Sequence, residues 1–109
     1  MIVRPLRAEP DHPALTPGRD YAVVGIEADA FRVIDDQGEP VLYDAVLFEV
    51  VDASVPPHWM DTRGADGERY AYPAALHRPG FFEDYFDGQP QAVAVFWQTI
   101  NSRLSQSAA

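Results

Sequence analysis

The chain has 109 residues, of which 47% are hydrophobic and 23% charged, and it contains no cysteine. This composition predicts one globular domain over residues 1–109, with no disulfide and no thiolate chemistry. No apolar run approaches the length of a membrane span, and the first residues contain no hydrophobic signal core. We therefore expect a cytoplasmic protein.

The negative charge is concentrated in one part of the sequence. Residues 20–52 carry nine acidic residues against Arg32 alone, which gives −8, whereas residues 1–19 sum to +1 and residues 53–109 to −2. Such a field repels nucleic acid and anionic lipid and speeds the encounter with a basic protein. We expect a protein partner, with no nucleic acid and no membrane; solubility is the alternative explanation of the charge.

The first half of the chain reads as an arm followed by strands. Residues 1–19 hold four prolines and predict an extended, loop-like arm. Residues 20–53 predict a core of four short strands, with a bend at Gly25 and a turn over 35–40. The expected strands are 21–27, 31–35, 41–43 and 45–52, the last with Val46, Phe48 and Val50 on one face.

The second half is less regular before it becomes helical. Residues 54–80 predict irregular structure, with a turn at 63–68 and a candidate fifth strand at 69–73. Residues 81–109 predict a helical cap that begins with a short aromatic turn. In its long helix one stripe is apolar, formed by Val93, Phe96, Trp97, Ile100 and Leu104.

Two aromatic features allow a structural and a functional interpretation. On a helical wheel, the aromatic residues of 81–86 separate from Glu83, Asp84 and Asp87, which favours a buried aromatic face and a solvated acidic face. The alternative is an exposed aromatic and acidic docking patch. Trp59, in a proline-flanked segment, either plugs the end of a barrel or anchors an interface.

Residues typical of catalysis form no recognisable motif. His12, His58 and His77 lack metal-ligand spacing, and no nucleophile elbow, phosphate-binding loop or dinucleotide fingerprint occurs. We expect no catalytic residue, no cofactor and no metal, and therefore no enzyme. A small enzyme or metal-binding protein remains an alternative.

The order of elements resembles known small folds. Residues 21–52 resemble SH3-like barrels in their sequence of strand, bend, strand, charged turn and further strands. With "PPHWM", "ERYAYP", "PGFFEDYFDG" and a terminal helix, the whole chain is similar to small acidic bacterial immunity proteins of polymorphic toxin systems. The resemblance implies a mainly β, β-rich α+β fold, an SH3-like antiparallel barrel with a C-terminal helix, and a chain that neutralises a basic toxin by covering its active surface.

Acidic side chains are the predicted contact residues for that partner. We expect Asp35, Asp36 and Glu39 of the hairpin turn to form the surface, with Asp44 nearby. The aromatic anchor would be Tyr43 or Trp59, and a second acidic edge would comprise Glu83, Asp84 and Asp87. An SH3-like adaptor for proline-rich peptides is the alternative, which requires an open groove lined by Tyr21, Tyr43 and Trp59.

Overall fold

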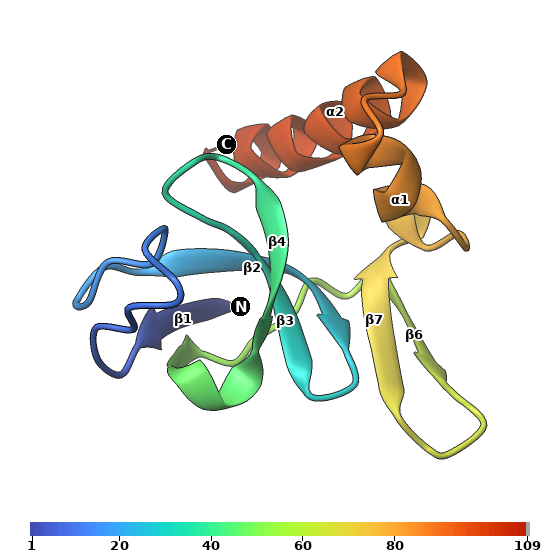
Figure 1. Cartoon of the computed structure of the whole chain (residues 1–109). Helices are drawn as coiled ribbons and strands as arrows, with labels where there is room; N and C mark the ends of the chain where they lie inside the picture. Colours follow the sequence, from blue (N-terminus) through green and yellow to red (C-terminus); the bar gives the residue numbers. More distant parts are fainter. Residues whose placement is uncertain (109) are drawn as a thin grey trace.

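The protein is a mostly β, α+β domain with an antiparallel sheet and a C-terminal helix (Figure 1). The computed structural model describes the backbone of residues 1–108 and the side chains of residues 1–102. The strands are β1 (Ile2–Pro5), β2 (Tyr21–Glu27), β3 (Ala30–Ile34), β4 (Pro40–Asp44), β5 (Phe48–Asp52), β6 (Trp59–Arg63) and β7 (Arg69–Pro73). The helices are the 3-10 turns η1 (Ala45–Leu47) and η2 (Ala74–Leu76), the short α1 (Phe81–Phe86) and the long α2 (Pro90–Ala108).

The sheet is organised around β2. Neighbouring strands follow the order β4-β3-β2-β1-β5, and η1 connects β4 to β5, which is the arrangement expected of an SH3-like barrel. Because β3 occupies one edge of β2, β1 and β7 share the other edge, β1 at Tyr21 and Ala22 and β7 at Ile26 and Glu27. The hairpin of β6 and β7 is thus an addition to the five-stranded unit.

Gly25 produces the bend that the sequence predicts. The register of β2 against β3 shifts between Val23 and Gly25. A Cβ atom at position 25 would overlap the ring carbons of Tyr72, so the close approach of this ring requires glycine. Tyr72 belongs to β7, and the bend therefore also fixes where the β6–β7 hairpin packs.

The expectation of an extended arm over residues 1–19 is wrong at its start. Residues 2–5 form β1, which lies between β2 and β5, and Val3 is fully buried. Residues 6–20 contain no further strand or helix, but Leu15 is buried in the core. The prolines of this segment led to the prediction of a loop, although β1 is only four residues long and one of these prolines, Pro5, is its last residue.

The irregular segment contains one strand that the sequence analysis missed. The candidate strand at 69–73 is β7, and the turn before it is confirmed by the backbone bond from Gly64 N to Glu68 O (2.7 Å). Its partner β6 was not expected, because four of its five residues face solvent and leave no apolar alternation to read. β6 pairs only with β7.

The last predicted strand of the barrel starts later than expected. Residues 45–47 form η1, so the strand begins at Phe48. Val46 is 73% exposed and Val50 46%, and of the predicted apolar face only Phe48 is buried. The side chain of Asp44 accepts a hydrogen bond from Val46 N (3.2 Å) and caps this 3-10 turn, which diverts the chain out of the strand.

Two hydrophobic clusters hold the domain together. The first fills the interior of the barrel, with Val3, Val33 and Phe48 among its buried residues. The second joins the helices to the sheet, and its buried residues are Val24, Tyr72, Leu76, Phe81, Tyr85, Ala92, Phe96 and Ile100.

The aromatic run at 81–86 faces mainly inward, as its helical wheel predicts. Phe81 and Tyr85 are buried and Phe82 is half-buried, whereas Phe86 is 52% exposed. In α2, Phe96 and Ile100 are buried as expected, and the side chain of Leu104 lies outside the described residues. The aromatic segment is therefore mainly part of the scaffold.

Candidate functional site

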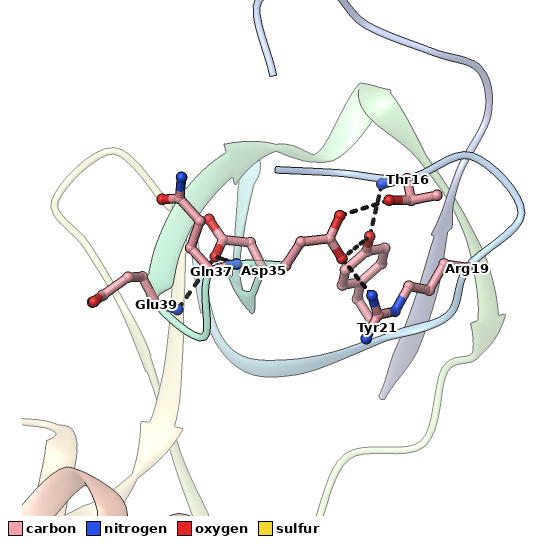
Figure 2. Close-up of polar contacts among 7 residues, drawn as sticks. Thr16, Arg19, Tyr21, Asp35, Gln37 and Glu39 are labelled. Carbon is pink, nitrogen blue, oxygen red and sulfur yellow. Dashed lines mark hydrogen bonds and ion pairs between the residues drawn. The ribbon is translucent and has the colours of Figure 1, made fainter. Parts of the chain in front are cut away.

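Asp35 fixes the turn between β3 and β4 from inside the protein (Figure 2). Its Oδ1 accepts the backbone N–H groups of Gln37 (2.9 Å) and Glu39 (3.2 Å), and its Oδ2 accepts the hydroxyl of Tyr43 (2.8 Å). Asp35 and Tyr43 are each 7% exposed, and burial together with the bond to Asp35 raises the pKa of Tyr43. Both were predicted to contact a partner, but the structure buries them against each other and leaves neither side chain exposed for such a contact.

Asp36, the next residue, is bound on the outer side of the same turn. Its carboxylate accepts hydrogen bonds from Thr16 Oγ1 (2.6 Å) and Tyr21 OH (2.7 Å) and pairs with Arg19 Nη1 (2.8 Å). The bonds from Thr16 and Tyr21 and the charge of Arg19 lower the pKa of Asp36. Figure 2 shows Thr16, Arg19 and Tyr21 converging there, so Asp36 fastens residues 16–21 to the turn.

Glu39 and Asp44 lie at opposite ends of the β3–β4 hairpin. Asp44 is paired with Ala30 at one end, and Pro40 is paired with Ile34 at the other. Four residue steps along a strand correspond to about 13 Å. The expectation that Asp44 lies near the acidic turn is therefore wrong: Asp44 is the N-cap of η1, which follows β4 at the end of the hairpin away from the turn.

The remaining predicted residues separate into scaffold and surface. Trp59 is half-buried and packs against the barrel core, which agrees with a plug rather than a projecting anchor. Glu83 is exposed on α1, Asp87 is exposed at its C-cap, and Asp84 pairs with Arg78 (2.9 Å). These acids form the solvated side of α1, as the wheel predicts.

Arginine neutralises much of the acidic segment. Arg4 pairs with Asp20 (2.7 Å) and more distantly with Glu49 (3.4 Å). Two further pairs join Glu27 to Arg32 and Asp36 to Arg19. Asp35 is buried and Asp52 accepts two bonds from Ser54. Four of the nine acids then pair with no arginine among the described side chains and keep a carboxylate oxygen available: Asp29, Glu39, Asp44 and Asp52, whose two bonds from Ser54 both fall on Oδ1.

Asp29 and Asp44 lie at the rim of one cleft, which we call the Asp29–Asp44 cleft. Its volume is about 560 Å³. The backbone bond from Ala45 N to Asp29 O (2.8 Å) holds the β2–β3 turn against η1. The cleft is mainly apolar, and its lining residues are Met1, Ile26, Ala28, Asp29, Phe31, Asp44, Ala45, Val46 and Arg69.

Sequence reasoning did not identify Asp29. No motif surrounds it, and the cleft forms only when the β2–β3 turn, η1 and the start of β7 come together. The residue types of the turn gave no local signal either, because it is Ala28, and not a glycine or asparagine, that adopts the left-handed conformation (φ 52°).

A second cleft, of about 350 Å³, contains a saturated polar network. Arg32 is 8% exposed and donates to Tyr72 OH (2.8 Å), Pro40 O (2.9 Å) and Glu27 Oε2 (2.7 Å). Its guanidinium carbon lies 3.8 Å from the centre of the Phe82 ring. Burial is the main cause of the raised pKa of Tyr72. These contacts connect β3, β7 and α1, and they give Arg32 a structural role.

No protein-family model, curated protein or solved structure matches this chain. Within residues 1–108, no helix is both long and apolar enough to cross a membrane. In the same part of the chain, no three side chains of histidine, aspartate or glutamate are grouped so that they could hold a metal ion.

Proposed function

We propose that this protein binds a basic protein partner in the manner of an immunity protein and blocks a functional surface of that partner. One observation carries the proposal: the Asp29–Asp44 cleft combines an apolar interior with two exposed carboxylates that pair with no arginine among the described residues. Interfaces gain affinity from a desolvated apolar centre and orientation from charged groups around it.

The neighbourhood of the cleft suits a macromolecular contact. Val46, at its edge, is 73% exposed, more than any other large apolar side chain within residues 1–102. A net charge of −9 draws a basic partner toward the chain before contact and disfavours nucleic acid. The neutralising mechanism is steric occlusion, with charge complementarity setting orientation and association rate.

The acids of the β3–β4 turn and the acidic edge at 83–87 have a secondary role in this proposal. Burial, and after it the charge of Glu39, raises the pKa of the Tyr85 phenol. Glu83 is exposed on α1 and Asp87 at its C-cap. These carboxylates add to the long-range field, whereas the primary contact is at the opposite end of the β3–β4 hairpin.

Growth rescue tests the proposal directly. The chain is expressed together with the product of its adjacent gene, and we expect it to abolish the toxicity of that product. The double variant Asp29→Lys/Asp44→Asn should lose this protection while remaining folded by circular dichroism, because asparagine still caps η1.

The matched control is Asp11→Lys/Asp66→Asn. This control changes the net charge by the same amount, and neither residue lines the cleft. Asp11 is exposed, as Asp29 is, and Asp66 accepts a backbone N–H in a turn, as Asp44 does. Protection should persist in this control. Equal protection by the cleft variant and the wild type would contradict the proposed surface, and no protection by the wild type would contradict the immunity function.

The adaptor alternative is weakened by burial. Tyr21 and Tyr43 are 4% and 7% exposed, and each hydroxyl donates to an aspartate of the β3–β4 turn. They therefore do not line the open aromatic groove that recognition of proline-rich peptides needs.

A further inference from the structure

We infer that the Asp29–Asp44 cleft receives an arginine side chain, which is the anchor residue of the partner. This inference rests on the proposed function, and it adds the chemistry of the residue that occupies the cleft.

The carboxylates are held by rigid turns and retain free acceptor capacity. Asp44 uses Oδ1 to cap Val46 N, which leaves Oδ2 available. The Asp29 carboxylate makes no hydrogen bond or ion pair with any described side chain or backbone group. Because Asp44 is paired with Ala30, the residue after Asp29, both acids lie at the same end of the β3–β4 hairpin. A cation between them can meet two carboxylates at once.

The interior of the cleft favours a planar cation on an aliphatic stem. Phe31 is half-buried, and its ring packs against Phe48 with 6.2 Å between the ring centroids. Val46 and Ala45 add aliphatic surface beside it. A guanidinium group stacks on aromatic faces, forms forked bonds to carboxylates and is weakly hydrated, whereas a lysine ammonium is a compact and strongly hydrated charge. The methylene groups of the arginine would lie along the valine.

Positive charges near the cleft are matched by other acids. Arg69 lines the cleft, but it is bound to Asp61 through Nε (2.8 Å) and Nη2 (2.7 Å). The hydrogen bonds from Ser54, and to a smaller extent the charge of the amino terminus, lower the pKa of Asp52. The negative charges of Asp29 and Asp44 at the rim are therefore not neutralised by these groups. A cation from the partner would neutralise them.

The test is a titration of the isotope-labelled chain with N-acetyl-arginine-N′-methylamide, followed by two-dimensional NMR. We expect saturable shifts of the backbone amides of residues 28–31 and 44–46, with a Kd on the order of 1 mM, as suits a single side chain. The citrulline analogue keeps the shape and lacks the charge, and it should bind at least about tenfold more weakly. The lysine analogue should also bind more weakly than arginine.

Two variants separate the cleft from the general negative field. Asp29→Asn/Asp44→Asn should weaken arginine binding at least about tenfold, whereas Asp11→Asn/Asp66→Asn, with the same charge change, should leave it within about twofold. Shifts outside the cleft, equal binding of the citrulline analogue or a preference for lysine would overturn the inference.

The titration and the growth assay can fail independently. If the arginine compound does not bind but the cleft variant still loses protection, the proposed function stands and the arginine anchor is wrong. If the arginine compound binds at the cleft but the cleft variant protects fully, the site is not the partner surface, and both the proposed surface and the arginine anchor of the partner are wrong.

Discussion

Replacing Asp35 by alanine should destabilise the protein without removing a contact residue. The substitution removes three hydrogen bonds to a buried carboxylate: two from the turn backbone and one from Tyr43. Hydrogen bonds to charged groups contribute about 1.5–3 kcal/mol each to the free energy of unfolding. Simple addition would give about 4.5–9 kcal/mol, which overestimates the loss because some donors regain water.

The exposure of the three donors decides how much of the lost hydrogen bonding water can replace in the variant. Gln37 is exposed and Glu39 half-buried, so their N–H groups can bind water in the variant, whereas the hydroxyl of Tyr43 is buried beside the vacated space. An unsatisfied buried hydroxyl costs about 1–3 kcal/mol. We therefore expect Asp35→Ala to lower the free energy of unfolding by about 3 kcal/mol, a large part of the 5–15 kcal/mol typical of domains.

Urea unfolding provides the measurement. Trp59 packs against the barrel core and Trp97 against the helical cluster, so fluorescence reports on both parts of the domain. Asp35→Asn keeps an acceptor for the turn and should cost about 1 kcal/mol. A double-mutant cycle with Tyr43→Phe should give a coupling energy of about 1–2 kcal/mol. A loss below 1 kcal/mol for Asp35→Ala, or additive single variants, would refute the reasoning.

Two further predictions concern the turn at acid pH and the bend in β2. The lowered pKa of Asp36 means that its ionised form stabilises the folded state above the ordinary aspartate value of 3.8, and that this contribution disappears as the pH falls through the lower folded-state pKa. Asp36→Asn should therefore give a flatter acid limb in a plot of unfolding free energy against pH; an unchanged limb contradicts the assignment. Gly25→Ala should lower the free energy of unfolding by about 2 kcal/mol, because the new methyl group displaces the ring of Tyr72 from its bonds with Arg32 and Glu27. In a Tyr72→Leu background the same change should cost less than about 1 kcal/mol, and an equal cost in both backgrounds would show that the ring is not the cause.

Elements set by local patterns could be predicted from the sequence. The short run at 21–27 is rich in β-branched residues and forms β2, and the run at 81–86, with its separate aromatic and acidic faces, forms α1. The segment at 2–5 was missed because it is stabilised by pairing with β2 and β5, which lie far from it in the sequence. The segment at 59–63 pairs with the next strand, β7, and was missed because its own residues show no apolar alternation. A five-residue segment that exposes four side chains contains no periodic signal of its own.

The candidate site was harder to predict because burial and ion pairing are not visible in the composition of a turn. Aspartates beside glycine in a turn usually face water, and Asp36 does lie at the surface. Asp35 points inward because Tyr43, eight residues later on the neighbouring strand, supplies a buried donor. Asp29 belongs to a cleft formed by several separate segments, so its position emerges only from the fold.

The summed charge of a sequence segment differs from the electrostatic field at the surface of the folded protein. The value of −8 over residues 20–52 suggested a single acidic surface, but Arg4 and Arg19, from the segment that sums to +1, fold back onto Asp20, Glu49 and Asp36. Such exposed pairs contribute little to stability, yet each cancels most of the local potential of an acid. In the proposed function, the charge available to a partner is therefore the part that folding leaves unpaired. At Asp29 and Asp44 that remainder adjoins apolar surface, which is where a basic side chain gains both attraction and burial.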